Sequence, residues 1–220
     1  MVYISANPII NSKISVKGFN AKEHFFKIID VWAMGWDEKW GTVPPEKVNE
    51  ALEKYKEIYP ERKFILHYLQ PHEPYLGDIR SVGFNKPNHG VVLGNSQSSY
   101  VNKYEVLIKI FSLLAKKFNI LGNKPSWKIR EFLNLPPVTP MDEVRRKYGD
   151  IGLRKAYENN LIVVLESVKN LVRGLSGRII ITSDHGELLG ENGNYSHGIK
   201  CMDPLLVEIP WFLIYESKEQ

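Results

Sequence analysis

The most informative stretch of the chain is Arg178-Ile-Ile-Ile-Thr-Ser-Asp-His-Gly-Glu187. Its β-branched run predicts a strand, and the glycine after the Asp-His pair predicts a sharp bend. Because open α/β sheets bind ligands at the carboxyl ends of their strands, Asp184 and His185 are expected to hold one divalent cation. The alternative is that Asp184 caps the next turn and His185 is only solvated. The crowding of two glutamates and His197 in the same loop favours the metal site.

The composition narrows the class of protein. The chain has 220 residues, 43% hydrophobic and 25% charged, which is enough for one compact core. The net charge of +4 comes from scattered lysines and arginines, so nucleic-acid binding is not expected. No apolar run approaches the length of a membrane span. Cys201, the single cysteine, excludes an internal disulfide and fits a reducing compartment, so we expect a cytoplasmic protein.

Strand and helix patterns alternate along the chain. Strands are expected at residues 2–5, 63–69, 178–183 and 211–215. Helices are expected at residues 20–31, 44–59, 101–118, 127–133, 141–148 and 157–171. In the 101–118 helix, the side chains expected to face inward are Val106, Ile110, Leu113 and Leu114.

This order of elements predicts the α/β class. We expect a three-layer α/β/α sandwich with a mostly parallel or mixed central sheet, in a single domain over residues 1–220. Residues 76–150 contain a turn-rich stretch and short helices, and they are expected to form a helical insertion within that domain.

Two further histidines are candidates for the same site. His72 lies in the exit loop of the 63–69 strand, between two prolines that make a rigid turn. His197 follows the Asp-His pair after Gly190 and Gly193, so this loop can double back. We expect both histidines to converge with Asp184 and His185 at one edge of the sheet.

These motifs together resemble the alkaline phosphatase and sulfatase superfamily, most closely its sulfatase-like proteins and phosphoethanolamine transferases. The likeness spans roughly residues 1–75 and 155–215. It is carried by Thr182-Ser-Asp-His-Gly-Glu187, Gly190-Glu-Asn-Gly193, Tyr195, His197-Gly198, the turn Gln70-Pro-His-Glu-Pro-Tyr75 and the segment Glu208-Ile-Pro-Trp211.

The resemblance implies a role for each candidate residue. Asp184 and His185 would bind a divalent metal ion, which we expect to be zinc, manganese or calcium. His72 and His197 would contact the phosphate or sulfate group of a substrate or hold a second metal ion. The implied substrate is a phosphate or sulfate ester.

The family pattern also contains parts that are not found here. Its members carry an N-terminal strand with an acidic metal ligand, followed by a Thr, Ser or modified Cys nucleophile at a helix N-terminus. The first strand here, residues 2–5, resembles the strand after that nucleophile helix. We therefore expect an N-terminally incomplete domain. The nucleophile is not identified, since Cys201 follows the metal motif and no motif supports Ser5.

Two classes of function remain open on the sequence. The first is a metal-dependent, sulfatase-like hydrolase or transferase acting on phosphate or sulfate esters, inactive or weak as the isolated chain. Its missing part would be supplied by a further N-terminal segment, by a second chain, or by a metal-bound hydroxide in place of the nucleophile. The alternative is a non-catalytic descendant of the superfamily that binds a metal or anion or serves in assembly.

Overall fold

The structure is a computed structural model that describes residues 1–16, 18–81, 83, 86–87, 105–117, 122–197 and 202–215. The chain is an α/β protein that divides into two compact units. Unit 1 contains Met1–Gln97 and Lys155–Lys169, and unit 2 contains Ser98–Arg154 and Asn170–Gln220.

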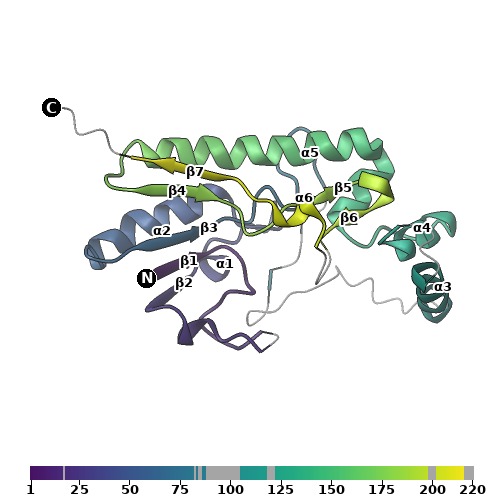
Figure 1. The fold of residues 1–220 in the computed structure, drawn as a ribbon, viewed down its shortest axis with the longest axis horizontal. Helices are drawn as coiled ribbons and strands as arrows, with labels where there is room; N and C mark the ends of the chain where they lie inside the picture. The colour runs from purple at the N-terminus through teal and green to yellow at the C-terminus, as the bar shows by residue number, and fades with distance from the viewer. Residues whose placement is uncertain are drawn as a thin grey trace. The chain divides into compact units, whose positions relative to one another are not determined.

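Unit 1 is built on a parallel sheet of three strands (Figure 1). Strand β1 (Val2–Ser5) lies between β2 (Lys27–Asp30) and β3 (Phe64–His67). Val2 and Ile4 of β1 are fully buried. The strands expected at residues 2–5 and 63–69 are therefore confirmed, the second over its central residues.

The helix expected at residues 20–31 is wrong. The segment forms a 3-10 turn, η1 (Ala21–Glu23), then strand β2, then one helical turn, α1 (Val31–Met34). Ile28 and Ile29 are both buried and pair with Tyr3 and Ile4 of β1. Burial beside β1 and the β preference of branched side chains together override the weak helical pattern.

Helix α2 (Pro45–Ile58) agrees with the sequence prediction. Pro45 occupies the first turn, where its missing N–H costs no helical hydrogen bond. Val48 and Leu52 form the buried face, and α2 packs on β1 and β3. Pro60 follows the last turn, and a proline there cannot continue a helix.

Unit 2 contains two antiparallel strand pairs (Figure 1). Strand β4 (Ile179–Thr182) pairs with β7 (Trp211–Ile214), which confirms the strands expected there. The β5–β6 hairpin joins β5 (Leu188–Leu189) to β6 (Tyr195–Ser196) through η2 (Glu191–Gly193). The remaining short helices are α3 (Glu105–Lys117), α4 (Pro125–Phe132) and α6 (Pro204–Val207).

Helix α5 (Pro140–Val172) contributes to both units. The helices expected at residues 141–148 and 157–171 are thus joined, with an interruption at Gly149 where φ is +67°. The expected insertion, residues 76–150, contains α3, α4 and the first turns of α5, while its residues 88–104 lie outside the described part. The single domain and its insertion stay predictions.

The face expected to be buried in the 101–118 helix is wrong in α3. Val106 and Leu113 are 67% and 68% exposed, whereas Ile108 is 3% exposed. Apolar residues cover more than half of the circumference of α3, so periodicity alone does not identify the packed side. Among the described residues, no helix combines the length and apolar character required to cross a membrane.

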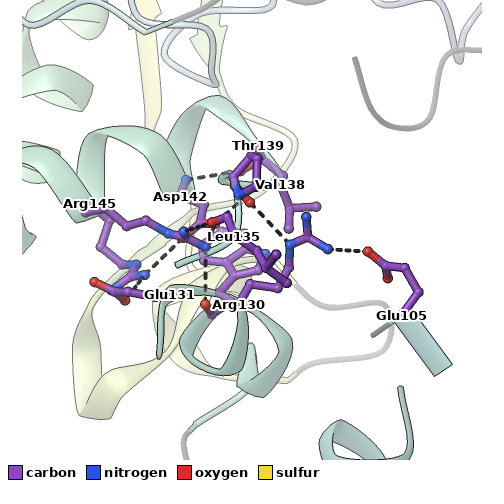
Figure 2. Close-up of polar contacts among 11 residues, drawn as sticks. Glu105, Arg130, Glu131, Leu135, Val138, Thr139, Asp142 and Arg145 are labelled. Atoms are coloured by element: carbon purple, nitrogen blue, oxygen red, sulfur yellow. Dashed lines mark hydrogen bonds and ion pairs between the residues drawn. The ribbon is translucent and has the colours of Figure 1, made fainter. Parts of the chain in front are cut away.

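A buried ionic network fixes the start of α5 (Figure 2). Asp142 has no solvent exposure and accepts hydrogen bonds from Arg145 at 3.0 Å and from Arg146 at 2.8 Å. The Thr139 hydroxyl caps the helix by accepting from the Asp142 N–H. Arg145 continues to Glu131 of α4 at 2.6 Å. Two cations and the Val138 N–H, at 3.1 Å, bind the buried carboxylate, so its burial is compensated.

Candidate metal centre

The end of β4 positions the Asp-His pair. Thr182, the last residue of β4, donates its hydroxyl to the Pro210 carbonyl at 2.7 Å, which ties the exit of β4 to the entry of β7. The chain then leaves the strand, and Asp184 stands 62% exposed at its carboxyl end. This is the placement that the sequence pattern predicts.

The Asp184 and His185 side chains have an arrangement suited to one cation. The His185 Nδ1 atom lies 2.8 Å from the Gly186 carbonyl, and because a carbonyl oxygen only accepts, Nδ1 carries the proton. The lone pair is therefore on Nε2, 3.8 Å from Asp184 Oδ1. Two metal–ligand bonds of about 2.0–2.1 Å each can span this distance. The Asp184 carboxylate and the His185 imidazole are therefore close enough to bind the same divalent ion.

Gly186 has a packing reason to be glycine. Its N–H donates to the Leu206 carbonyl at 2.9 Å. A Cβ atom added at Gly186 would lie 1.9 Å from the Leu205 carbonyl oxygen, far inside contact distance. The bend after His185 is therefore held against α6 by backbone contact.

The β5–β6 hairpin returns the chain to this point. Leu188 pairs with Ser196 and Leu189 with Tyr195, so His197 emerges beside Glu187. His197 Nδ1 lies 3.0 Å from the Glu187 carboxylate, whose side chain is only 3% exposed. A carboxylate that accepts from Nδ1 fixes the ring orientation, so Nε2 is the atom that can coordinate a metal ion in the neutral ring or donate to an anion in the protonated ring.

The two imidazoles lie against each other. The ring centroids of His185 and His197 are 4.1 Å apart, with planes inclined by 40°. The structure thus brings together Asp184, His185, Glu187 and His197, all in unit 2. We call these four residues the His-Asp cluster.

His72 belongs to unit 1. It lies between the cis peptide bonds Gln70–Pro71 and Glu73–Pro74, and its Nδ1 is 3.0 Å from the Glu73 carbonyl. As in His185, this contact places the proton on Nδ1 and the lone pair on Nε2. The expected convergence of His72 with the other candidates stays a prediction.

Asn160 was not recognised in the sequence as a residue of the His72 turn. Its side chain, fully buried, accepts from the Leu76 N–H at 2.7 Å. Its amide nitrogen lies 2.9–3.3 Å from the carbonyl oxygens of Pro71, His72 and Pro74. The sequence contained a signal for its burial, namely its helical spacing with Ala156 and Val164, which share the buried face of α5 with Asn160.

The sequence analysis also did not identify Asn123 as a partner of Tyr195. Asn123 exchanges two hydrogen bonds with the Tyr195 backbone, at 2.8 and 2.9 Å. The Tyr195 hydroxyl donates to Asp150 at 2.9 Å. Burial, and then this hydrogen bond, raises the pKa of Tyr195 to about 12. These contacts hold the strand that precedes His197.

Other residues of the motif have structural roles or are not described. Glu191 accepts from the Leu189 N–H and pairs with Arg154 at 2.8 Å, so it stabilises the hairpin loop. Gly198 and Cys201 lie outside the described residues.

No family model, no curated protein and no solved structure matches the chain. The likeness to the alkaline phosphatase and sulfatase superfamily therefore rests on the motifs at residues 70–75, 182–198 and 208–211 and stays a hypothesis.

Proposed function

We propose that the protein is a metal-dependent hydrolase or transferase of phosphate or sulfate esters. The observation that supports this most directly is the His-Asp cluster, in which Nδ1 of His185 and of His197 each has an acceptor and the two rings are 4.1 Å apart. Asp184 and His185 are the proposed ligands of the ion.

The remaining roles follow from the resemblance. His197, oriented by Glu187, contacts an ester oxygen or a second ion. His72 enters the proposal from the sequence motif alone, with the same role. An imidazole and a carboxylate suit zinc or manganese better than calcium, which prefers oxygen ligands.

A bound divalent ion would act as a Lewis acid on the ester and lower the pKa of water to about 7. The chain's own side chains supply orientation and charge. The carboxylate of Glu187 retains the His197 ring in one tautomer, and the Gly186–Leu206 contact keeps His185 at the end of β4.

The proposal includes a fold and a cellular compartment. We propose that the strands belong to a three-layer α/β/α sandwich of the superfamily type, in a cytoplasmic protein. The substrate is a phosphate or sulfate ester, and a second chain is a candidate to complete the site.

One observation favours the alternative, a non-catalytic metal- or anion-binding protein. Thr182 is the threonine nearest the Asp-His pair along the chain, and its hydroxyl is bound to the Pro210 carbonyl. Without a positioned nucleophile, attack on the ester would be poorly aligned, and we expect the 220-residue chain alone to be slow or inactive.

Metal binding is tested by calorimetric titration of the metal-free protein with zinc and with manganese. We expect weak binding by the wild type, since two protein ligands leave a four-coordinate ion half satisfied. His185→Ala should weaken it at least about tenfold. His24→Ala, a change at an exposed histidine of η1's C-terminal end, is the matched control. Equal titrations for wild type and His185→Ala would show that the pair is structural only.

Catalysis is tested with an aryl phosphate and an aryl sulfate, using the metal-loaded wild type, Asp184→Ala and His72→Ala. We expect little turnover and metal-dependent binding of inorganic phosphate or sulfate that both variants weaken. Anion binding without turnover fits either an incomplete enzyme or the non-catalytic alternative. Fast turnover that Asp184→Ala abolishes would show a complete enzyme with an unfamiliar nucleophile.

A further inference from the structure

Helix α3 presents an unusually large apolar surface to solvent. Six of its large apolar side chains are 48–68% exposed: Val106, Leu107, Ile110, Phe111, Leu113 and Leu114. At about 100° of rotation per residue, they form one continuous arc of about 160° on the helix. We call this the α3 apolar arc. Apolar surfaces gathered in this way mark sites of interaction.

The side of α3 opposite the arc is buried. Ile108 is 3% exposed and Ser112 9% exposed, and both fall outside the arc. Helix α3 packs against α4 within unit 2. The arc is therefore not the side by which α3 is attached to the rest of unit 2.

The charges around the arc are basic. Residues 105–132, which span α3 and α4, contain six lysines and arginines against two acidic residues. Both acidic side chains are ion-paired, Glu105 with Arg130 and Glu131 with Arg145. Lys109, beside the arc, and Lys117, in the last turn of α3, are exposed. The apolar surface thus has Lys109 beside one edge and Lys117 at the C-terminal end of the helix.

We propose that α3 docks the protein on an anionic lipid surface. The α3 apolar arc would lie at the boundary of head groups and acyl chains, with Lys109 and Lys117 at the lipid phosphates. An exposed apolar face with basic residues is the pattern of helices that lie in the membrane interface. This proposal is independent of the metal centre.

The charge pattern favours lipid over a second copy of the chain. A symmetric contact between two arcs would place Lys109 and Lys117 of both copies in one interface, while the two acidic residues nearby are engaged by arginines. An anionic bilayer supplies the opposite charge to both lysines. Association of two copies is therefore an outcome that the test must detect.

The test is co-sedimentation of the full chain with vesicles of phosphatidylcholine alone or with added phosphatidylserine. We expect binding to the anionic vesicles at least about tenfold tighter than to the neutral ones, falling as salt rises. The double variant Val106→Glu with Leu113→Glu should lose this binding, because it places charges in the arc. Ile151→Glu, at an 86% exposed residue of α5, is the matched control and should bind like the wild type.

A second measurement keeps the proposal testable if the double variant does not fold. In Phe111→Trp the indole replaces an exposed ring of the arc. Relative to the wild type, which has five tryptophans of its own, the emission should shift to the blue only with anionic vesicles. Absence of wild-type binding, or equal binding by the double variant, would overturn the proposal. So would a concentration-dependent dimer, seen by sedimentation equilibrium, that the double variant abolishes in the absence of vesicle binding.

Discussion

At the scale of single residues, the candidate site depends on which nitrogen of each imidazole ring carries the proton. In His72, His185 and His197, the neighbour of Nδ1 is an oxygen, so Nδ1 carries a proton and, in the neutral ring, the lone pair falls on Nε2. The acceptors are backbone carbonyls for His72 and His185 and the buried Glu187 carboxylate for His197. Such partners are needed because a histidine that rotates or changes tautomer is a poor ligand.

Asn160 offers a test of how strongly the His72 turn is held. Asn160→Ala would leave the half-buried Leu76 N–H and the Pro71, His72 and Pro74 carbonyls without their side-chain partner. We expect a loss of about 2–4 kcal/mol in the free energy of unfolding, measured by urea denaturation.

The matched control is Asn159→Ala, the same change at the preceding, half-buried residue of α5. It should cost less than about 1 kcal/mol. Equal losses in the two variants would mean that the Asn160 contacts contribute nothing particular to stability.

Tyr195 should make stability depend on alkaline pH. Its pKa is raised to about 12, above the ordinary value of 10.0, because burial and the bond to Asp150 favour the protonated phenol. The stabilisation is complete below pH 10, where an unfolded tyrosine is also protonated. It is lost as pH rises toward 12.

Tyr195→Phe separates this contribution from other titrating groups. The variant should be less stable than wild type by about 1–2 kcal/mol at pH 8, and this difference should shrink from pH 10 upward. Urea denaturation of both proteins from pH 7 to 11 measures it. Tyr215→Phe, at a 68% exposed ring, is the control. A difference that grows with pH would contradict the assignment.

At the scale of elements, the site depends on contacts that join short segments of unit 2. The exit of β4 is held by Pro210, the bend at Gly186 by α6, and the β5–β6 hairpin by Asn123. Each element is too short to be stable alone, so the loop contacts determine where the cluster residues lie.

Gly186→Ala tests the contact between the bend and α6. The added methyl group would overlap the Leu205 carbonyl, so one of the two segments must move. We expect a loss of about 1–3 kcal/mol in stability and at least about tenfold in zinc affinity.

Gly174→Ala is the control for this change. Its Cβ would meet only the Leu171 carbonyl oxygen, at an ordinary 3.7 Å. Zinc titration and urea denaturation of the two variants give the comparison. Wild-type zinc affinity in Gly186→Ala would show that the bend does not position His185.

At the scale of the complete chain, binding of a metal ion should raise the free energy of unfolding. An ion that binds only the folded protein stabilises it by about 2.7 kcal/mol at a concentration 100 times its Kd. For a chain of this size, that corresponds to a rise in Tm of roughly 5–10 °C.

Calorimetric scans with zinc, and with zinc followed by a chelator, measure this rise. We expect the wild type to gain stability, the chelator to remove the gain, and His185→Ala to show none. An equal rise in the variant would place the bound ion away from the His-Asp cluster.

Several elements follow directly from local sequence. The β-branched run at residues 178–183 and the apolar run at 63–69 predict β4 and β3, and Pro45 with apolar residues at helical spacing predicts α2. The positions of Asp184 and His185 at the end of β4 were predicted for the same reason. Strand propensity, turn formation and helix starts depend on neighbouring residues, so a short window contains the information.

Other features depend on residues far apart in the chain. Residues 27–30 become a strand because Val2–Ser5 lies beside them, and the buried side of α3 is set by packing against α4. Asn123 reaches Tyr195 across 72 residues, and Asn160 reaches the His72 turn across more than 80. Strand neighbours and hydrogen-bond partners at such separations are absent from any local pattern, so only tertiary packing could assign these residues their roles.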